Sequence, residues 1–96
     1  MTKKILLSRQ ATVINELGMH ARPAAWIAEM AMEGKGDIRL FKGSSEVDAS
    51  SIIDILTLGA EKGSQILIQA ESDEDREIVE KIKAFFDIGF GELNNE

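Results

Sequence analysis

The chain's only histidine and only proline, His20 and Pro23, lie within the stretch "GMHARPAA", with Arg22 between them. A neutral imidazole is a nucleophile near neutral pH, and a guanidinium matches the oxygens of a phosphate group. This combination points to chemistry on an anionic group, provided that the fold holds the two side chains at one place.

The local backbone gives two interpretations of this cluster. Pro23 favours the first turn of a helix, because its missing N–H group has no intrahelical role there. On the simpler interpretation the stretch is only a helix start, and His20 is incidental. On the other, His20 precedes the unpaired N–H groups of a helix N-terminus, which favour an anion, and Arg22 adds a charged donor. Together they would hold a phosphoryl group attached to the imidazole.

The composition limits the other functions that the chain can have. Ninety-six residues with a net charge of −6 suit one domain over residues 1–96, which we expect to bind neither nucleic acid nor an anionic membrane. The chain has no cysteine, and one histidine cannot build an imidazole-based metal centre, so no metal or cofactor is expected. Ser8, Arg9 and Gln10 interrupt the N-terminal apolar run. We therefore expect no signal peptide or membrane span and predict a cytoplasmic protein.

Apolar periodicity predicts four strands and three helices in the order β-α-β-β-α-β-α. This order indicates an α+β fold with helices on one face of a mostly antiparallel sheet. In the second helix, we expect Ile52, Ile55 and Leu56 to share the buried face. The strands are predicted at residues 5–14, 37–43, 45–49 and 64–71, and the helices at 23–33, within 50–60 and from 73 onward.

The segment "GMHARPAA", preceded by a strand and opening a helix, resembles the active-site segment of HPr, the histidine phosphocarrier family of the bacterial sugar phosphotransferase system. The resemblance extends nearly from end to end. The stretch "SSIIDILTLGAEKGSQILIQAE" is similar to the family's second helix and fourth strand, and "FGE" near the C-terminus is a common ending. The resemblance implies the open-faced β-sandwich of HPr, with four mostly antiparallel strands in the order 1-4-2-3 and three helices on one face.

The resemblance also implies roles for single residues. His20 matches the histidine phosphorylated on Nδ1, Arg22 matches the arginine that steadies the phosphoryl group, and the backbone of Ala21 and Arg22 matches the N–H groups that contact it. Enzyme I, charged by phosphoenolpyruvate, would donate the phosphoryl group, and enzyme IIA domains would accept it for sugar uptake. The chain would be a monomeric, stoichiometric carrier and not an enzyme. The alternative is a regulatory relative whose phosphorylation state controls nitrogen or carbon metabolism without transport.

Ser51 matches a serine that an ATP-dependent kinase phosphorylates in many relatives from Gram-positive bacteria. The same residue is a good N-cap for the following helix, with Asp54 in the position of a capping-box acid. Ser50 and Asp54 depart from the family pattern, and the Asp54 carboxylate would repel a phosphoserine one turn away. Helix capping and regulatory phosphorylation therefore both stay open for Ser51.

Trp26 and Ile53 are predicted to dock partner proteins. At 100° per residue, Trp26 projects off the buried stripe of its helix, and Ile53 lies off the buried face of its own helix. An exposed aromatic ring is typical of an interface anchor, while partial burial at the core edge is the simpler interpretation. Ile53 would extend the same patch. Glu29 lies where many relatives carry a basic residue, so a partner would need a compensating charge.

Overall fold

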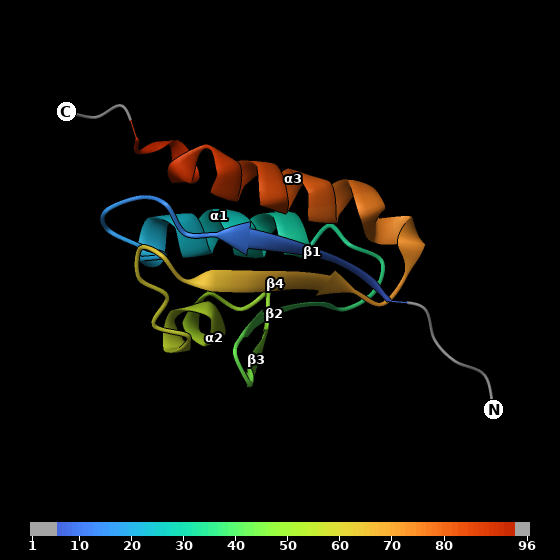
Figure 1. The fold of residues 1–96 in the computed structure, drawn as a ribbon. Coiled ribbons are helices and arrows are strands. Elements are labelled where there is room, and N and C mark those ends of the chain that lie inside the picture. The colour runs from blue at the N-terminus through green and yellow to red at the C-terminus, as the bar shows by residue number, and fades with distance from the viewer. Residues whose placement is uncertain (1–5, 94–96) are drawn as a thin grey trace.

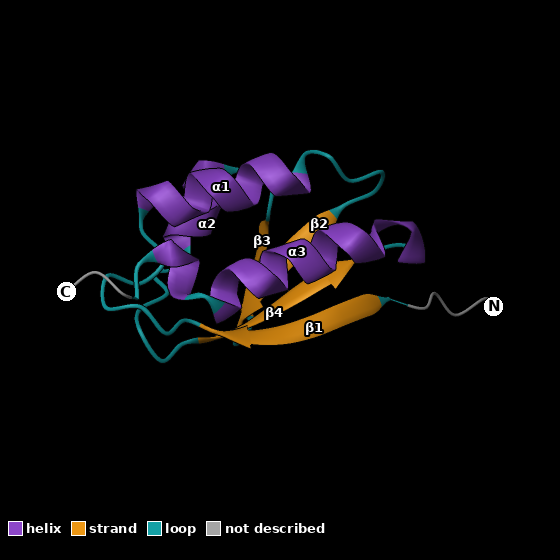
Figure 2. Cartoon of the chain, turned by 90° about the horizontal axis from the view of Figure 1, so that it is seen from above, coloured by secondary structure: helices purple, strands orange, loops and turns teal. Residues whose placement is uncertain are grey.

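The computed structural model describes residues 6–93, which form one four-stranded sheet with three α-helices on one face (Figures 1 and 2). The sheet order is β1-β4-β2-β3, and every neighbouring pair is antiparallel. This confirms the predicted α+β fold and strand order. The elements are β1 (Leu7–Thr12), α1 (Ala21–Ala31), β2 (Ile38–Lys42), β3 (Ser45–Asp48), α2 (Ile52–Thr57), β4 (Gln65–Ala70), α3 (Arg76–Asp87) and the 3-10 turns Asp73–Asp75 and Gly89–Gly91.

Strand β4 shows why one face of the sheet is covered and the other is open. Ile66, Ile68 and Ala70 alternate toward the buried face, and Ile68 pairs with Leu40 of β2. Side chains on a strand alternate between faces, so Leu67 and the residues two positions before and after it lie on the other face. The first predicted strand began at Ile5, which lies outside the described residues.

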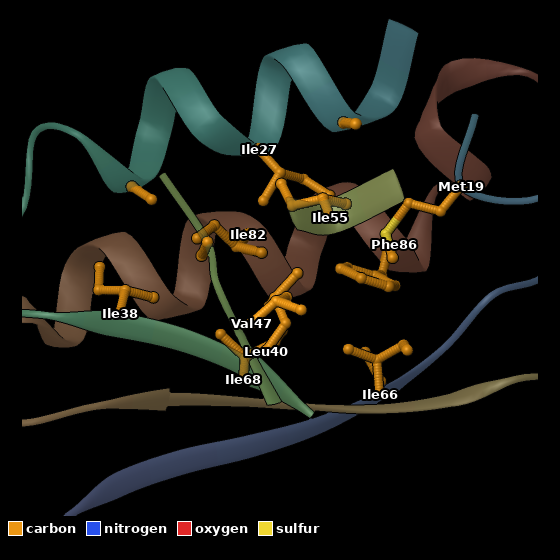
Figure 3. Close-up of a cluster of buried hydrophobic side chains, with 14 of the residues drawn as sticks. Met19, Ile27, Ile38, Leu40, Val47, Ile55, Ile66, Ile68, Ile82 and Phe86 are labelled. Carbon is orange, nitrogen blue, oxygen red and sulfur yellow. The ribbon is translucent and has the colours of Figure 1, made fainter. Parts of the chain in front are cut away.

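The hydrophobic core lies between the buried face of the sheet and the three helices (Figure 3). Ile27 of α1, Ile82 and Phe86 of α3 and Ile55 of α2 are almost completely buried there. The prediction for α2 is only partly right, because Ile52 and Leu56 are 41% and 40% exposed. A helix of six residues lies against the core through a single side chain.

Helices α1 and α3 run in opposite directions over the sheet, as both ribbon views show. The start of α1 and the end of α3 therefore lie at the same end of the molecule, at the left of Figures 1 and 2. This arrangement brings residues 89–93, which follow α3, to the start of α1. None of the helices within residues 6–93 is long and apolar enough to cross a membrane.

Candidate functional site

His20 is the N-cap residue of α1, and the loop before it is held against the residues after α2. Its backbone is extended, with φ −83° and ψ −169°. Gly18 has a φ of +71°, and a Cβ at this position would lie 2.7 Å from the carbonyl oxygen of Ala60. The N–H group of the buried Met19 donates to the same oxygen at 2.9 Å. These restraints hold the His20 side chain, 35% exposed, at the start of the helix.

Helix α1 begins with two backbone N–H groups, those of Ala21 and Arg22, that have no hydrogen-bond partner among residues 6–93. The first bond of the helix runs from the N–H of Ala24 to the carbonyl of His20 at 3.0 Å, and Pro23 has no N–H group. Unpaired N–H groups at a helix N-terminus carry a partial positive charge. The start of α1 can therefore bind an anion beside the His20 ring.

Glu92, from the other end of the chain, joins the side chains at the start of α1. Its Oε2 lies 2.8 Å from Nε2 of His20 and 2.5 Å from Nη2 of Arg22. Its Oε1 accepts a hydrogen bond from Nδ2 of Asn15 at 2.7 Å. Nη2 of Arg22 also donates to the carbonyl oxygen of Phe90 at 2.9 Å. One carboxylate thus connects the imidazole, the guanidinium and the loop that precedes α1.

The charge of Glu92 fixes which nitrogen of His20 carries a hydrogen. Burial of the side chain, 14% exposed, by itself raises the pKa of Glu92, but hydrogen bonds from Arg22, His20 and Asn15 outweigh it and lower the pKa to about 2. An ionised carboxylate only accepts hydrogen bonds, so Nε2 of His20 must donate. A neutral His20 then keeps its lone pair on Nδ1, for which no partner is found within residues 6–93.

The turn Gly89–Gly91 brings Glu92 to this position. All three residues of the turn have positive φ, including Phe90 at +58°. This conformation costs a non-glycine residue roughly 1–2 kcal/mol. The Phe90 ring is buried, with its centroid 5.1 Å from that of Phe85 and 4.9 Å from that of Phe86. Packing of the ring offsets the backbone strain and holds the turn in place.

A solvent-open hollow of about 830 Å³ lies beside these groups. Beside the side chains of His20 and Arg22, it leaves space for a phosphoryl group and for the side chain that delivers it. No cluster of three His, Cys, Asp or Glu side chains in residues 6–93 could hold a metal ion. The lining residues include His20, Arg22, Glu92, Leu17 and Leu93, together with the ion pair between Glu16 and Lys62.

The structure separates the two predicted docking residues. Trp26, 51% exposed, lies between α1 and α3 beside Ile88. Ile53, 74% exposed, lies between α1 and α2 beside Met32. The two side chains line different grooves bordering α1, and whether Ile53 extends the Trp26 patch stays a prediction. Whether either residue binds a partner stays a prediction.

Ser51 is the N-cap of α2, as predicted, and its Oγ accepts a hydrogen bond from the N–H of Asp54 at 3.2 Å. The residue is partly buried and lines the groove between α1 and α2, together with Glu29. Within residues 6–93, no basic side chain lines this groove. A phosphate on Ser51 would therefore face the carboxylates of Glu29 and Asp54, and its regulatory phosphorylation stays a prediction.

Two residues of the site, Glu92 and Asn15, were not predicted from the sequence. The signal for Glu92 is the "GFG" that precedes it, because two glycines around one apolar residue favour a tight reversal of the chain. Asn15 carries no such signal in the sequence. It is buried, its Nδ2 also donates to the carbonyl of Gly18 at 3.0 Å, and its Oδ1 has no partner within residues 6–93.

Comparison with known proteins shows which family the chain resembles. The family described as "PTS HPr component phosphorylation site" matches residues 7–87. The chain is 40% identical over 86 residues to phosphocarrier protein HPr of Chlamydia pneumoniae, covering 88% of this chain and 80% of that protein. It is 35% identical over 85 residues to phosphocarrier protein NPr of Proteus mirabilis, covering 88% and 94%.

Solved structures show the same fold. The structure described as HPr-C-His from Thermoanaerobacter tengcongensis superposes with a TM-score of 0.82 at 29% identity, covering 88% of this chain and 96% of that chain. Another structure, described as an HPr dimer from the same organism, has a TM-score of 0.69 at 32% identity, covering 82% and 91%. The oligomeric state of this chain is therefore not fixed by its fold.

Proposed function

Since the chain belongs to the HPr family of phosphocarrier proteins, we propose that it carries a phosphoryl group on Nδ1 of His20. The observation that carries this assignment is the Glu92 carboxylate, which lies 2.8 Å from Nε2 and leaves the lone pair on Nδ1. The free N–H groups of Ala21 and Arg22 support it, because they provide an anion site at the start of α1.

The proposed transfer moves the phosphoryl group between two imidazoles. The lone pair of Nδ1 forms a bond to the phosphorus of a phosphohistidine on the donor, while the donor's P–N bond breaks and its electron pair returns to the donor's ring. The hydrogen on Nε2 stays in place, so the His20 ring becomes positively charged. The Glu92 carboxylate stabilises this charge. Transfer to an acceptor is the same step in reverse.

The phosphoryl group is an anion that approaches a protein with a net charge of −6. The long-range field of the protein is therefore unfavourable, and local donors must compensate for it. We assign this role to the guanidinium of Arg22 and to the backbone N–H groups of Ala21 and Arg22. Arg22, which binds Glu92 in the unphosphorylated chain, would turn from this carboxylate to the phosphoryl oxygens.

We further propose that enzyme I, charged by phosphoenolpyruvate, is the donor and that enzyme IIA domains are the acceptors. The chain is then a cytoplasmic, stoichiometric carrier that returns to its initial state only when a second protein accepts the group. We expect a monomer, which sedimentation velocity would test. A regulatory carrier without transport is the second candidate, because relatives named NPr match at 35% identity and those named HPr match at 30% and 40%.

Labelling with enzyme I and radioactive phosphoenolpyruvate tests the site. We expect one phosphoryl group per chain, labile in acid and stable in alkali, and none in His20→Ala. Arg22→Ala is the matched control, because it keeps the imidazole and the helix end and should still be labelled. Equal labelling of the wild type and of His20→Ala, with both chains folded in urea titrations, would overturn the assignment.

A second experiment separates transport from regulation. The labelled chain is mixed with an enzyme IIA domain, and the transfer of label is followed with time. A transport carrier loses its label rapidly, whereas a regulatory carrier keeps it when the sugar-specific domains are offered. Retention of the label would favour the regulatory function and leave the assignment of His20 intact.

A further inference from the structure

The groove between α1 and α3 is an apolar surface without a partner in the folded chain. It has a volume of about 550 Å³, and we name it the α1–α3 groove. Trp26 and Ile88 on its walls are 51% and 58% exposed. Its lining consists of Arg22, Trp26 and Met30 of α1, Lys81, Ala84 and Phe85 of α3, and Ile88, Phe90 and Gly91 after α3.

The charges of this groove are opposite to the charge of the whole protein. The net charge is −6, yet among residues 6–93 the charged side chains that line the groove are the two cations Arg22 and Lys81. Lys81 forms no ion pair within residues 6–93, whereas Lys83 on the same helix is bound to Asp87. The Lys81 ammonium is therefore available to an external carboxylate.

The two cations lie toward opposite ends of the groove. Nη2 of Arg22 donates to the carbonyl of Phe90, which places it at the end where α3 finishes. Lys81 lies about two helical turns before Ile88, or roughly 10 Å along α3 at 1.5 Å per residue. The pattern is a positive charge, an apolar floor and a second positive charge.

We propose that the α1–α3 groove is a docking surface for an acidic amphipathic segment of another protein. A carboxylate at one end of this segment would pair with Lys81. A carboxylate at the other end would pair with Nε and Nη1 of Arg22, because Nη2 is already bound to Glu92. An apolar side chain between the two carboxylates would pack against Trp26 and Ile88. Charge complementarity selects such a segment against a basic one. Burial of the exposed Trp26 ring supplies the apolar part of the affinity, since tryptophan is a common interface anchor.

Docking at this surface does not require phosphorylation of His20, although a phosphoryl group there would compete with the segment for the Arg22 guanidinium. It includes Arg22 and Gly91 of the hollow beside His20, but the imidazole itself does not line it. A His20→Ala chain should therefore bind the segment as the wild type does. This variant separates the docking proposal from the proposed phosphoryl transfer, because it removes only the latter.

Two synthetic helical peptides test the proposal. The first presents Leu and Phe on one face, with Glu residues two turns apart on either side of them, and the second has Lys at the Glu positions. Neither contains Trp, so the fluorescence of Trp26, the chain's only tryptophan, reports binding. We expect saturable binding of the Glu peptide and at least roughly tenfold weaker binding of the Lys peptide.

Charge reversal on the protein gives the decisive comparison. Lys81→Glu should weaken binding of the Glu peptide and strengthen binding of the Lys peptide, each by roughly tenfold. Lys35→Glu is the matched control, because it makes the same change of net charge on an exposed residue after α1 and outside the groove. Both variants remove exposed side chains, and urea unfolding confirms that each is folded.

Four outcomes would overturn the proposal. The first is equal binding of the two peptides, and the second is an equal effect of Lys81→Glu and Lys35→Glu. The third is no saturable binding of the Glu peptide, while vesicles with phosphatidylglycerol change the Trp26 fluorescence, which would identify a membrane surface. The fourth is a dimer in sedimentation experiments that Lys81→Glu or Trp26→Ala dissociates, which would identify a second copy of the chain as the occupant.

Discussion

The two grooves that border α1 have the same volume, about 550 Å³, but they differ in charge and in their relation to His20. The α1–α3 groove carries the cations Arg22 and Lys81 and shares Arg22 with the hollow beside the imidazole. The groove between α1 and α2, the α1–α2 groove, carries Glu29 and shares no lining residue with that hollow. One helix thus borders two grooves of opposite charge, and among residues 6–93 only the α1–α3 groove shares lining residues with the hollow beside His20.

The helical repeat of α1 accounts for this division. Residues at i, i+4 and i+8 lie along one side of a helix, and Arg22, Trp26 and Met30 follow that spacing toward α3. The row that begins at Ala25 and includes Glu29 faces α2. Substitutions in one row can therefore change one groove and leave the other intact.

The largest effect is expected at Arg22, the residue that connects the α1–α3 groove to His20. In Arg22→Ala the helix end remains, so phosphohistidine still forms, but the rate of transfer should fall roughly a hundredfold, or about 3 kcal/mol, because a donor that stabilises the transition state is lost. Arg22→Lys should recover part of the rate, since it keeps the charge and loses the planar fork. Rapid-quench transfer with enzyme I and an enzyme IIA domain measures both directions.

Arg39→Ala is the control for this experiment, because Arg39 lies on β2 and pairs with the exposed Glu46. It should leave the transfer rates at the wild-type value. Wild-type rates in Arg22→Ala in both directions would mean that the N–H groups of the helix terminus alone stabilise the phosphoryl group.

The next effect concerns the separateness of the two grooves. Loss of an interface anchor costs about 1–3 kcal/mol of binding free energy. Trp26→Ala should therefore weaken binding of a partner at the α1–α3 groove by this amount, and Ile53→Ala should do the same for a partner at the α1–α2 groove. Calorimetric titrations of enzyme I and of an enzyme IIA domain into both variants measure it. We expect each partner to be sensitive to one variant, because none of the residues that the structure describes lines both grooves.

Equal sensitivity to the two variants, with strong coupling in the double variant, would contradict the division. Side chains that act independently have additive effects, whereas side chains within one contact surface do not. Such a result would restore the single patch that the sequence suggested.

The start of α1 could be predicted from the sequence because its chemistry is local. His20, Arg22 and Pro23 are neighbours in the chain, and the periodicity of the following residues predicts the helix that positions them. The sheet order followed from the resemblance to HPr. The Glu92 contact could not be predicted, because it depends on the length and direction of α3 and on the turn around Phe90, which only the assembled fold brings beside α1.

The error at α2 has a different physical cause. The periodicity placed Ile52, Ile55 and Leu56 on one face, but a helix of six residues has too little length to bury a full stripe. The exposed Ile52 and the adjacent Ile53 line the α1–α2 groove instead. Apolar periodicity indicates which residues share a face, and tertiary packing decides how much of that face is covered.

The third effect is a pH dependence of the free energy of unfolding. It comes from Glu92, which binds Arg22 of the α1–α3 groove. Its pKa is about 2 in the folded chain, below the ordinary value of 4.5. A carboxylate with a lowered folded pKa stabilises the fold above its unfolded pKa, and this contribution is lost as the pH falls from about 4.5 to about 2. Because Arg22 is half exposed, we expect a contribution on the order of 1–2 kcal/mol.

Urea unfolding at about pH 6 and about pH 3 measures this contribution. Glu92→Gln should be less stable than the wild type at the higher pH. Its free energy of unfolding should also differ less between the two pH values. Glu16→Gln is the control, because the bond to Lys62 lowers the pKa of Glu16 on the exposed surface. Identical pH profiles for wild type and Glu92→Gln would mean that the carboxylate does not stabilise the fold.

The smallest effect is expected in the α1–α2 groove, at Ser51. Removal of an N-cap typically costs about 1 kcal/mol, so Ser51→Ala should lower the free energy of unfolding by this amount. Ser51→Asp should keep most of the stability, because aspartate is also a good N-cap, while it adds a carboxylate near Glu29. Ser44→Ala, in the exposed turn between β2 and β3, is the control and should change stability by less than about 0.5 kcal/mol. Urea titrations compare the three variants, and equal stabilities of Ser51→Ala and Ser44→Ala would show that the cap contributes nothing. Ser51→Asp also tests binding, provided that it keeps the stability that the N-cap supplies. If it then weakens binding of a partner whose binding Ile53→Ala also weakens, the negative charge of the α1–α2 groove controls binding there, independently of Arg22 and His20.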